Sequence, residues 1–114
     1  MKIIPEPGSE RGIIRLAGEI DLCSVPELRN ALELMAELHR PMLLIDLSGV
    51  TFLDSSGLSI LIDYWRRTQE NGSKFVVVGA AGEVLEIFRL TNLDQFIPLF
   101  ATEREACSAL DLVA

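Results

Sequence analysis

The segment PMLLIDLSGVTFLDSSGLSILIDYW, residues 41–65, is the longest apolar-dominated run in the chain, yet its middle is polar. Leu43 to Leu47 is a short aliphatic stretch typical of a strand that is covered on both faces. From Leu58 to Trp65 the apolar residues recur three and four positions apart, which predicts a helix packing one side inward. Asp54 to Gly57, four small polar residues, lie between the two. We therefore expect a polar corner where a buried strand passes into a packed helix.

The composition of the 114 residues is that of one globular domain, residues 1–114, with 49% hydrophobic and 24% charged residues. No apolar run approaches the roughly 20 residues of a membrane-spanning helix, so membrane insertion is not expected. The N-terminal residues MKIIPEPGSERG do not resemble a secretory signal, and the cytoplasm is the expected compartment. The net charge of −7, with scattered Lys and Arg, argues against direct nucleic-acid binding.

The two cysteines, Cys23 and Cys107, are far apart in the sequence and have no His or Cys nearby at metal-ligand spacing. Their helix-like surroundings predict small buried or half-buried side chains rather than a redox pair. No metal and no cofactor is predicted.

The first half of the chain predicts a hairpin followed by a helix. Residues 2–4 form a candidate strand stopped by Pro5 and Pro7, and residues 12–17 a second strand that the chain leaves at residues 18–21. Ser24-Val25-Pro26-Glu27 fits a capping box that opens a helix ending before Pro41, and Asn71-Gly72 closes the helix after the polar corner.

In the second half, residues 74–78 predict another buried strand, and residues 83–90 predict a helix. Residues 96–100 predict a short edge strand weakened by Pro98, before a terminal helix from Thr102 that carries Leu110 and Val113. The element order is β-β-α-β-α-β-α-β-α. Right-handed crossovers then give an α/β fold, a mixed but mostly parallel sheet that opens with an antiparallel hairpin.

The polar corner has two interpretations. Asp54, Ser55 and Ser56 are all capping residue types, so an ordinary helix N-cap explains part of the pattern. Only one of them can cap, however, and partner sites in parallel α/β sheets lie beyond the carboxyl ends of strands. The following helix carries a hydrophilic stripe, which is either a solvated face or a protein contact: Ser56, Ser59, Asp63, Arg66, Arg67 and Glu70. Ile60 and Tyr64 are expected to border it, half-buried.

Enzymatic alternatives fit the chain poorly. The only histidine, His39, lies at the far end of a helix from the serines, and no G-x-S-x-G elbow is present. Residues 79–82, GAAG, lack the Lys-Ser/Thr ending of a P-loop. A phosphoacceptor role for Asp46, as in receiver domains, fits poorly because Asp46 falls inside the strand pattern and Lys74 begins its strand. The chain is predicted not to be an enzyme.

Residues 43–58, LLIDLSGVTFLDSSGL, resemble the signature of the STAS family, and more closely that of bacterial anti-sigma factor antagonists. Gly18-Glu19-Ile20-Asp21 and the leucine-rich turn at residues 90–96 resemble further elements of that family, so the likeness spans essentially the whole chain. The resemblance implies a protein that binds a kinase-type anti-sigma factor. That kinase then phosphorylates the second serine of the corner, here Ser56, and the complex dissociates; a serine phosphatase restores the binding form.

Transferred residue by residue, the resemblance makes Ser56 the phosphoacceptor, with Asp54 positioning the corner and Ser55 capping the helix. The partner contact is expected to include Asp21, Asp54, Ser55, Gly57, Ser59, Ile60 and Asp63. Two other roles share this fold and stay open: a stand-alone STAS subunit of a lipid-type ABC transporter, and a scaffold component of a stress-signalling assembly.

Overall fold

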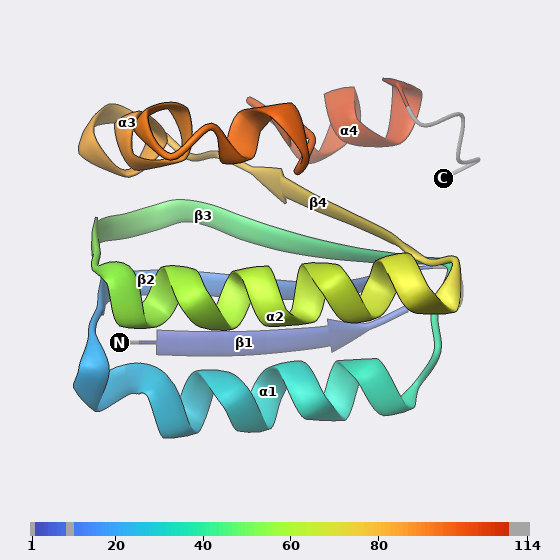
Figure 1. Cartoon of the computed structure of the whole chain (residues 1–114). Coiled ribbons are helices and arrows are strands. Elements are labelled where there is room, and N and C mark those ends of the chain that lie inside the picture. Colours follow the sequence, from blue (N-terminus) through green and yellow to red (C-terminus); the bar gives the residue numbers. More distant parts are fainter. Residues whose placement is uncertain (1, 9–10, 110–114) are drawn as a thin grey trace.

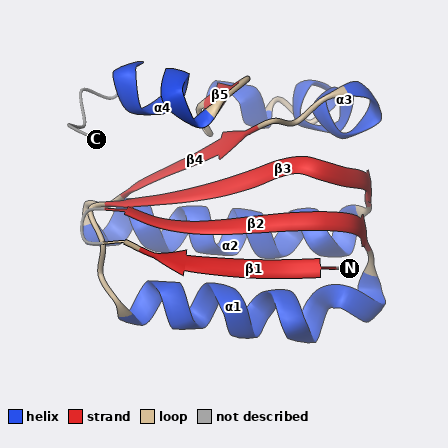
Figure 2. Cartoon of the chain, turned by 180° about the vertical axis from the view of Figure 1, so that it is seen from behind, coloured by secondary structure: helices blue, strands red, loops and turns tan. Residues whose placement is uncertain are grey.

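The computed structural model describes residues 2–8 and 11–109. Within these residues five strands form one sheet, in the order β1-β2-β3-β4-β5 (Figures 1 and 2). The strands are β1 (Lys2–Pro7), β2 (Arg11–Ile20), β3 (Met42–Leu53), β4 (Lys74–Val78) and β5 (Leu99–Phe100). The pair β1–β2 is antiparallel and the other pairs are parallel. The predicted α/β fold with its opening hairpin is therefore confirmed.

Helices follow the strands in the predicted order. They are α1 (Val25–Glu37), α2 (Ser55–Asn71), α3 (Gly82–Leu90) and α4 (Glu103–Ala109), with short 3-10 turns η1 (Leu22–Ser24) and η2 (Leu93–Gln95). Helices α1 and α2 lie side by side on one face of the sheet, as both cartoon views show (Figures 1 and 2). Among the described residues, no helix is both long and apolar enough to cross a membrane.

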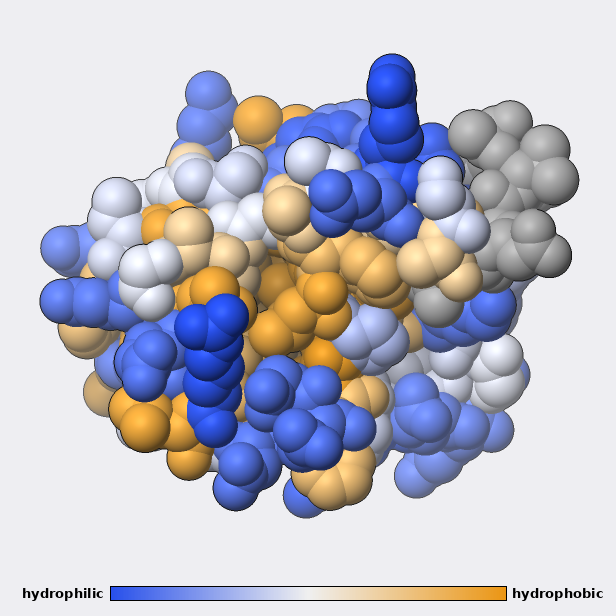
Figure 3. All heavy atoms as spheres, turned by 90° about the horizontal axis from the view of Figure 1, so that it is seen from above, coloured by the Kyte–Doolittle hydropathy of each residue, from blue (hydrophilic) through white to orange (hydrophobic). Residues whose placement is uncertain are grey.

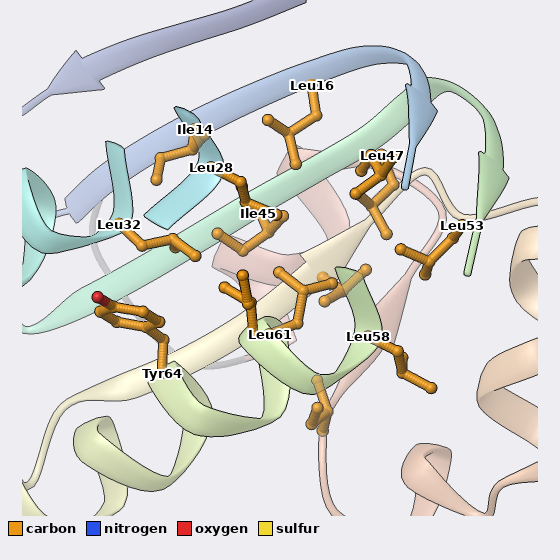
Figure 4. Close-up of a cluster of buried hydrophobic side chains, with 14 of the residues drawn as sticks. Ile14, Leu16, Leu28, Leu32, Ile45, Leu47, Leu53, Leu58, Leu61 and Tyr64 are labelled. Carbon is orange, nitrogen blue, oxygen red and sulfur yellow. The ribbon is translucent and has the colours of Figure 1, made fainter. Parts of the chain in front are cut away.

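The alternation of side chains along the strands divides the buried residues between two faces. The larger cluster lies on the face where Ile14, Ile45 and Val77 pack with residues of α1, α2 and α3 (Figure 4). On the other face, Met42, Leu44 and Val76 pack beneath Ala106 and Cys107 of α4. The central strands are thus buried on both sides, which explains their continuous aliphatic runs.

Three predicted boundaries of the hairpin and the first helix are wrong. β1 runs through Pro5 and Pro7, because an edge strand tolerates residues that lack an amide hydrogen. β2 does not end at Ala17 but continues to Ile20, with two irregularities in its register against β3. Ser24 makes no side-chain cap at the start of α1, so the expected Ser24–Glu27 capping box is absent.

Further expectations fail at exposed or irregular positions. The last strand is only Leu99–Phe100, because η2 turns the chain before it and Pro98 has no amide hydrogen to pair. Cys23 is exposed, against the prediction, whereas Cys107 is buried. Thr102 does cap the last helix, accepting a hydrogen bond from the amide of Glu105. Leu110 and Val113 lie outside the described residues.

Candidate functional site

The site lies where β2 and β3 end side by side and each passes into a helix (Figure 1, left). The last residues of the two strands, Ile20 and Leu53, are register partners. The amide of Asp54 donates to the carbonyl oxygen of Ile20 at 3.1 Å, so the strand pairing extends into the corner. Asp21 and Asp54 therefore follow directly on two neighbouring strand ends. This is the carboxyl edge of the parallel sheet, as expected.

Asp54 is the N-cap of α2. Its backbone is extended, and its Oδ1 atom accepts hydrogen bonds from the amides of Ser56, at 2.9 Å, and Gly57, at 3.1 Å. The prediction that Ser55 caps the helix is therefore wrong. The carboxylate takes this role because one of its oxygens can satisfy two amide donors at once.

The two serine hydroxyls are consequently left out of the cap. In the part of the chain that is described, neither the Ser55 nor the Ser56 hydroxyl makes a hydrogen bond to another protein group. Ser55 is exposed and Ser56 is half-buried. Both hydroxyls are available to an incoming group, at the positive end of a helix of 17 residues.

Gly57 is buried at the base of this turn. A Cβ atom at this position would lie 2.5 Å from Cγ2 of Ile20 and 2.8 Å from Cδ1 of Leu53. Both distances are well below carbon–carbon contact. The absence of a side chain therefore lets the first turn of α2 lie directly on the ends of β2 and β3.

A second cap stands next to the first. Oδ1 of Asp21 accepts from the amides of Cys23, at 3.0 Å, and Ser24, at 3.3 Å, while the Ser24 hydroxyl donates to the carbonyl oxygen of Glu19 at 3.1 Å. The amide of Asp21 in turn donates to Oγ of Ser24 at 3.4 Å, so Asp21 and Ser24 form the capping box of η1. The signal was present in Asp21-Leu22-Cys23-Ser24, but Ser24 and Glu27, at the same spacing, match the better-known residue types of a capping box.

The surroundings of Asp21 are acidic. An open hollow of about 330 Å³ is lined by Glu19, Asp21, Cys23, Ser24 and Glu27. Two exposed apolar side chains adjoin the strand ends: Leu22, which is 70% exposed, and Phe52, which is 44% exposed. Glu27, Leu22 and Phe52 were not predicted as site residues. For Phe52 the alternation along β3 was the available signal, because its neighbour Leu53 faces inward.

The solvent-facing side of α2 carries Ser59, Asp63, Arg66 and Glu70, all exposed, with Ser56 at its start. The expected half-buried border is wrong, because Ile60 and Tyr64 are only 3% and 2% exposed. Tyr64 packs toward α1, and its hydroxyl donates a hydrogen bond to Glu33 of that helix at 2.7 Å. Ile60 lies in the main core beneath the exposed face.

The other chemically capable groups lie elsewhere. His39 follows α1 and lines a cavity of about 30 Å³ with Arg40 and Met42, at the beginning of β3 rather than at its end. Another hollow, of about 380 Å³, lies between α3 and β5, lined by residues such as Leu85 and Phe100. Figure 3 shows the face of the molecule that carries α3 and α4, and apolar side chains (orange) gather near the centre of this face. Within residues 2–8 and 11–109, no three His, Cys, Asp or Glu side chains converge as metal ligands would.

The chain is similar in sequence and in fold to known proteins. The chain is 29% identical over 102 residues to the anti-sigma-B factor antagonist of Listeria monocytogenes, which covers 90% of each chain. An anti-sigma factor antagonist from Mycobacterium paratuberculosis has a solved structure with a TM-score of 0.87 and 31% identity, covering 96% of this chain and 93% of that one. The anti-sigma factor antagonist SpoIIAA, solved in its unphosphorylated form, shares the fold, with a TM-score of 0.79, 22% identity and 99% of both chains covered. The STAS domain model matches residues 2–106, and the chain belongs to the STAS domain family.

Proposed function

We propose that this chain is an anti-sigma factor antagonist, a binding protein and not an enzyme. It binds a kinase-type anti-sigma factor while Ser56 carries a free hydroxyl, and phosphorylation of Ser56 by that kinase releases it. The similarity to proteins named anti-sigma factor antagonists supports this role. The single structural observation that carries it is the cap by Asp54. Because this carboxylate satisfies the first amides of α2, the Ser56 hydroxyl is left for a partner.

The proposed contact surface begins at the serine corner and continues along α2. Asp21, Asp54, Ser55, Ser59 and Asp63 contribute their exposed or half-exposed side chains. Gly57 and Ile60 belong to the same surface through their backbone and their support from beneath, since both are buried. A surface of mixed polar groups with the apolar Leu22 and Phe52 beside it suits a reversible protein contact.

A phosphate on Ser56 acts on the partner rather than on the fold. It adds about −1.5 to −2 charges at neutral pH. The helix N-terminus stabilises this charge within the protein. Toward a partner surface that fits a neutral hydroxyl, the same charge adds to those of Asp54 and Asp21 and brings repulsion and desolvation. A loss of about 3 kcal/mol of binding free energy weakens the complex more than 100-fold.

The cycle needs two further proteins and one compartment. A serine phosphatase removes the phosphate and returns the chain to its binding form. The cytoplasm is the place of action, because a switch that consumes ATP to regulate transcription operates there. No cofactor is required of the chain itself, since phosphoryl transfer is performed by the kinase.

The test is phosphorylation by candidate anti-sigma factor kinases from the source genome, each purified and incubated with the chain and ATP. Mass spectrometry should place one phosphate on Ser56. Ser56→Ala should bind the kinase and take up no phosphate, whereas the matched variant Ser55→Ala should be phosphorylated like the wild type. A phosphate that maps to Ser55 or to another residue would contradict the assignment of Ser56. If no such kinase binds the chain, the antagonist role itself is wrong.

A further inference from the structure

Two chemically equivalent hydroxyls stand next to each other at the start of α2, and the more accessible one is not the proposed acceptor. Ser55 is exposed, whereas Ser56 is half-buried. Neither hydroxyl makes a hydrogen bond to another protein group in the described part of the chain. Exposure alone would therefore favour Ser55, so some other feature of the corner must select Ser56.

Direction is the feature that distinguishes the two serines. Successive residues of an α-helix are rotated by about 100° and raised by about 1.5 Å, so a partner docked on one side of α2 is presented with one of them. Phosphoryl transfer requires the hydroxyl in line with the γ-phosphate, and a misplacement of about 1 Å can cost about 100-fold in rate. The acceptor is thus decided by the height and rotation of the first helical turn.

Three contacts set that height and rotation. The amide of Asp54 is bonded to Ile20, and its carboxylate holds the amides of Ser56 and Gly57. The third contact is Gly57 itself, on the Cγ2 methyl of Ile20. The backbone of Gly57 does not have a positive φ, so the glycine is required for closeness and not for an unusual conformation. A Cβ at this position would be about 1 Å too close to Ile20 for ordinary contact.

We propose that Gly57, in contact with Ile20, is the positioning residue that selects Ser56 over Ser55 as phosphoacceptor. This inference rests on the proposed function, because it concerns the same phosphorylation. Any side chain at position 57 lifts the first turn of α2 from the strand ends and turns the Ser56 hydroxyl away from the line of attack. Ile20 need not touch the kinase for this effect.

The test measures where the phosphate goes, which a merely structural role would not change. The probe is the anti-sigma factor kinase that phosphorylates the wild type, with ATP. For Gly57→Ala we expect kcat at Ser56 to fall by about 100-fold. Phosphate should also appear on Ser55. The control Gly49→Ala brings its Cβ to 2.9 Å from that of Ala17, between β2 and β3 but away from α2, and should leave the acceptor unchanged.

A second set of variants keeps the test decisive if Gly57→Ala does not fold. Ile20→Val retains the Cγ2 methyl and should behave as the wild type, whereas Ile20→Ala removes it and should lower kcat at Ser56 with the KM for ATP unchanged. The double variant Ile20→Ala/Gly57→Ala removes the closer of the two clashes and leaves the new methyl 2.8 Å from Cδ1 of Leu53, the flexible end of a side chain. It should therefore recover phosphorylation of Ser56 relative to Gly57→Ala.

The outcomes separate the two claims. If the wild type is phosphorylated on Ser56, and Gly57→Ala and Ile20→Ala are phosphorylated there with unchanged kcat, the positioning role is wrong and the antagonist function stands. If the wild type takes no phosphate on Ser56, the proposed phosphoacceptor fails and the positioning role fails with it.

Discussion

At the scale of single residues, the corner depends on one carboxylate oxygen. Oδ1 of Asp54 accepts both amide hydrogens at the start of α2, at 2.9 and 3.1 Å. The same residue donates its amide to Ile20, so it joins the end of β2 to the start of the helix. Asp54 therefore stabilises the helix and leaves the serine hydroxyls free in one arrangement.

Replacing Asp54 by alanine should lower the free energy of unfolding by about 1 kcal/mol, the usual cost of an N-cap. Asp54→Asn keeps an accepting oxygen and should lose much less. Urea denaturation of the three proteins measures the difference. Ser55→Ala is the matched control and should be close to neutral; a larger loss for Ser55→Ala than for Asp54→Ala would contradict the assignment of the cap.

The corner was predictable from its residue types, but the division of roles within it was not. Asp54, Ser55 and Ser56 are all good capping residues, and only the direction of the entering chain decides between them. The strand pairing that orients Asp54 continues through Ile20, beyond the predicted end of β2 at Ala17. The role of Gly57 was equally hidden, since a close approach between segments far apart in sequence leaves no local pattern.

At the scale of elements, ion pairs and hydrogen bonds join the helices and strands that carry the corner. Glu33 of α1 accepts hydrogen bonds from Tyr64 and Arg67 of α2, and the Arg67 guanidinium lies 4.8 Å from the centre of the Tyr64 ring. Burial, and next the bond to Glu33, raise the pKa of Tyr64 to about 12, so its hydroxyl remains a donor at neutral pH. These contacts fix α2 against α1.

The contacts of Glu33 with Tyr64 and Arg67 make the stability of the fold depend on pH. The hydrogen bond from Arg67, and then that from Tyr64, hold the pKa of Glu33 below its usual value. The stabilisation is therefore present above the pKa of an unfolded glutamate, about 4.3, and is lost as the pH falls through the lower pKa of the folded state. The melting temperature should therefore fall as the pH is lowered below about 5. It should fall less in Glu33→Gln, measured relative to the variant's own value at neutral pH.

Glu37→Gln is the control, since Glu37 is an exposed residue of the same helix. It should follow the wild-type pH profile. A melting temperature that is equally sensitive to acid in Glu33→Gln and in the wild type would show that Glu33 does not contribute.

Asp46 also makes the fold less stable in acid. Burial favours its neutral form, but hydrogen bonds from Ser48 and Arg15 outweigh this and lower its pKa.

Elements with a periodic apolar pattern were predicted well, and those defined by long-range pairing were not. β4 and the C-terminal end of α2 match the prediction residue by residue, since a β-branched run and Asn71-Gly72 are local signals. The end of β1 was misjudged because edge position, not composition, decides whether a proline is tolerated. The start of β5 was misjudged because η2 turns the chain just before it. The burial of Tyr64 depends on a partner on another helix, which its own spacing could not reveal.

At the scale of the whole molecule, the corner rests on a core that phosphorylation does not enter. Ile20, Leu53 and Leu58 are nearly fully buried beneath it, and the main core joins three helices to the sheet (Figure 4). Ser56 is at the outer end of this layer, and its hydroxyl makes no hydrogen bond to another described group. A charge added at Ser56 should therefore change the surface and leave the fold intact.

The variant Ser56→Asp tests this separation of surface from fold. Its melting temperature should stay within about 4 °C of the wild type, a shift that corresponds to about 1 kcal/mol for a domain of this size. Circular dichroism provides the measurement, with Leu61→Ala as a core variant that should lose about 2–5 kcal/mol. Unfolding of Ser56→Asp would mean that the corner is structural and not a switch.

The most direct measurement is the affinity of the chain for the proposed anti-sigma factor kinase before and after phosphorylation of Ser56. Titration calorimetry on the two purified forms gives both dissociation constants, and a melting curve of each verifies that both are folded. We expect the phosphorylated form to bind at least about 100-fold more weakly while it remains folded. Equal affinities for the two folded forms would contradict the claim that the Ser56 hydroxyl is the switch.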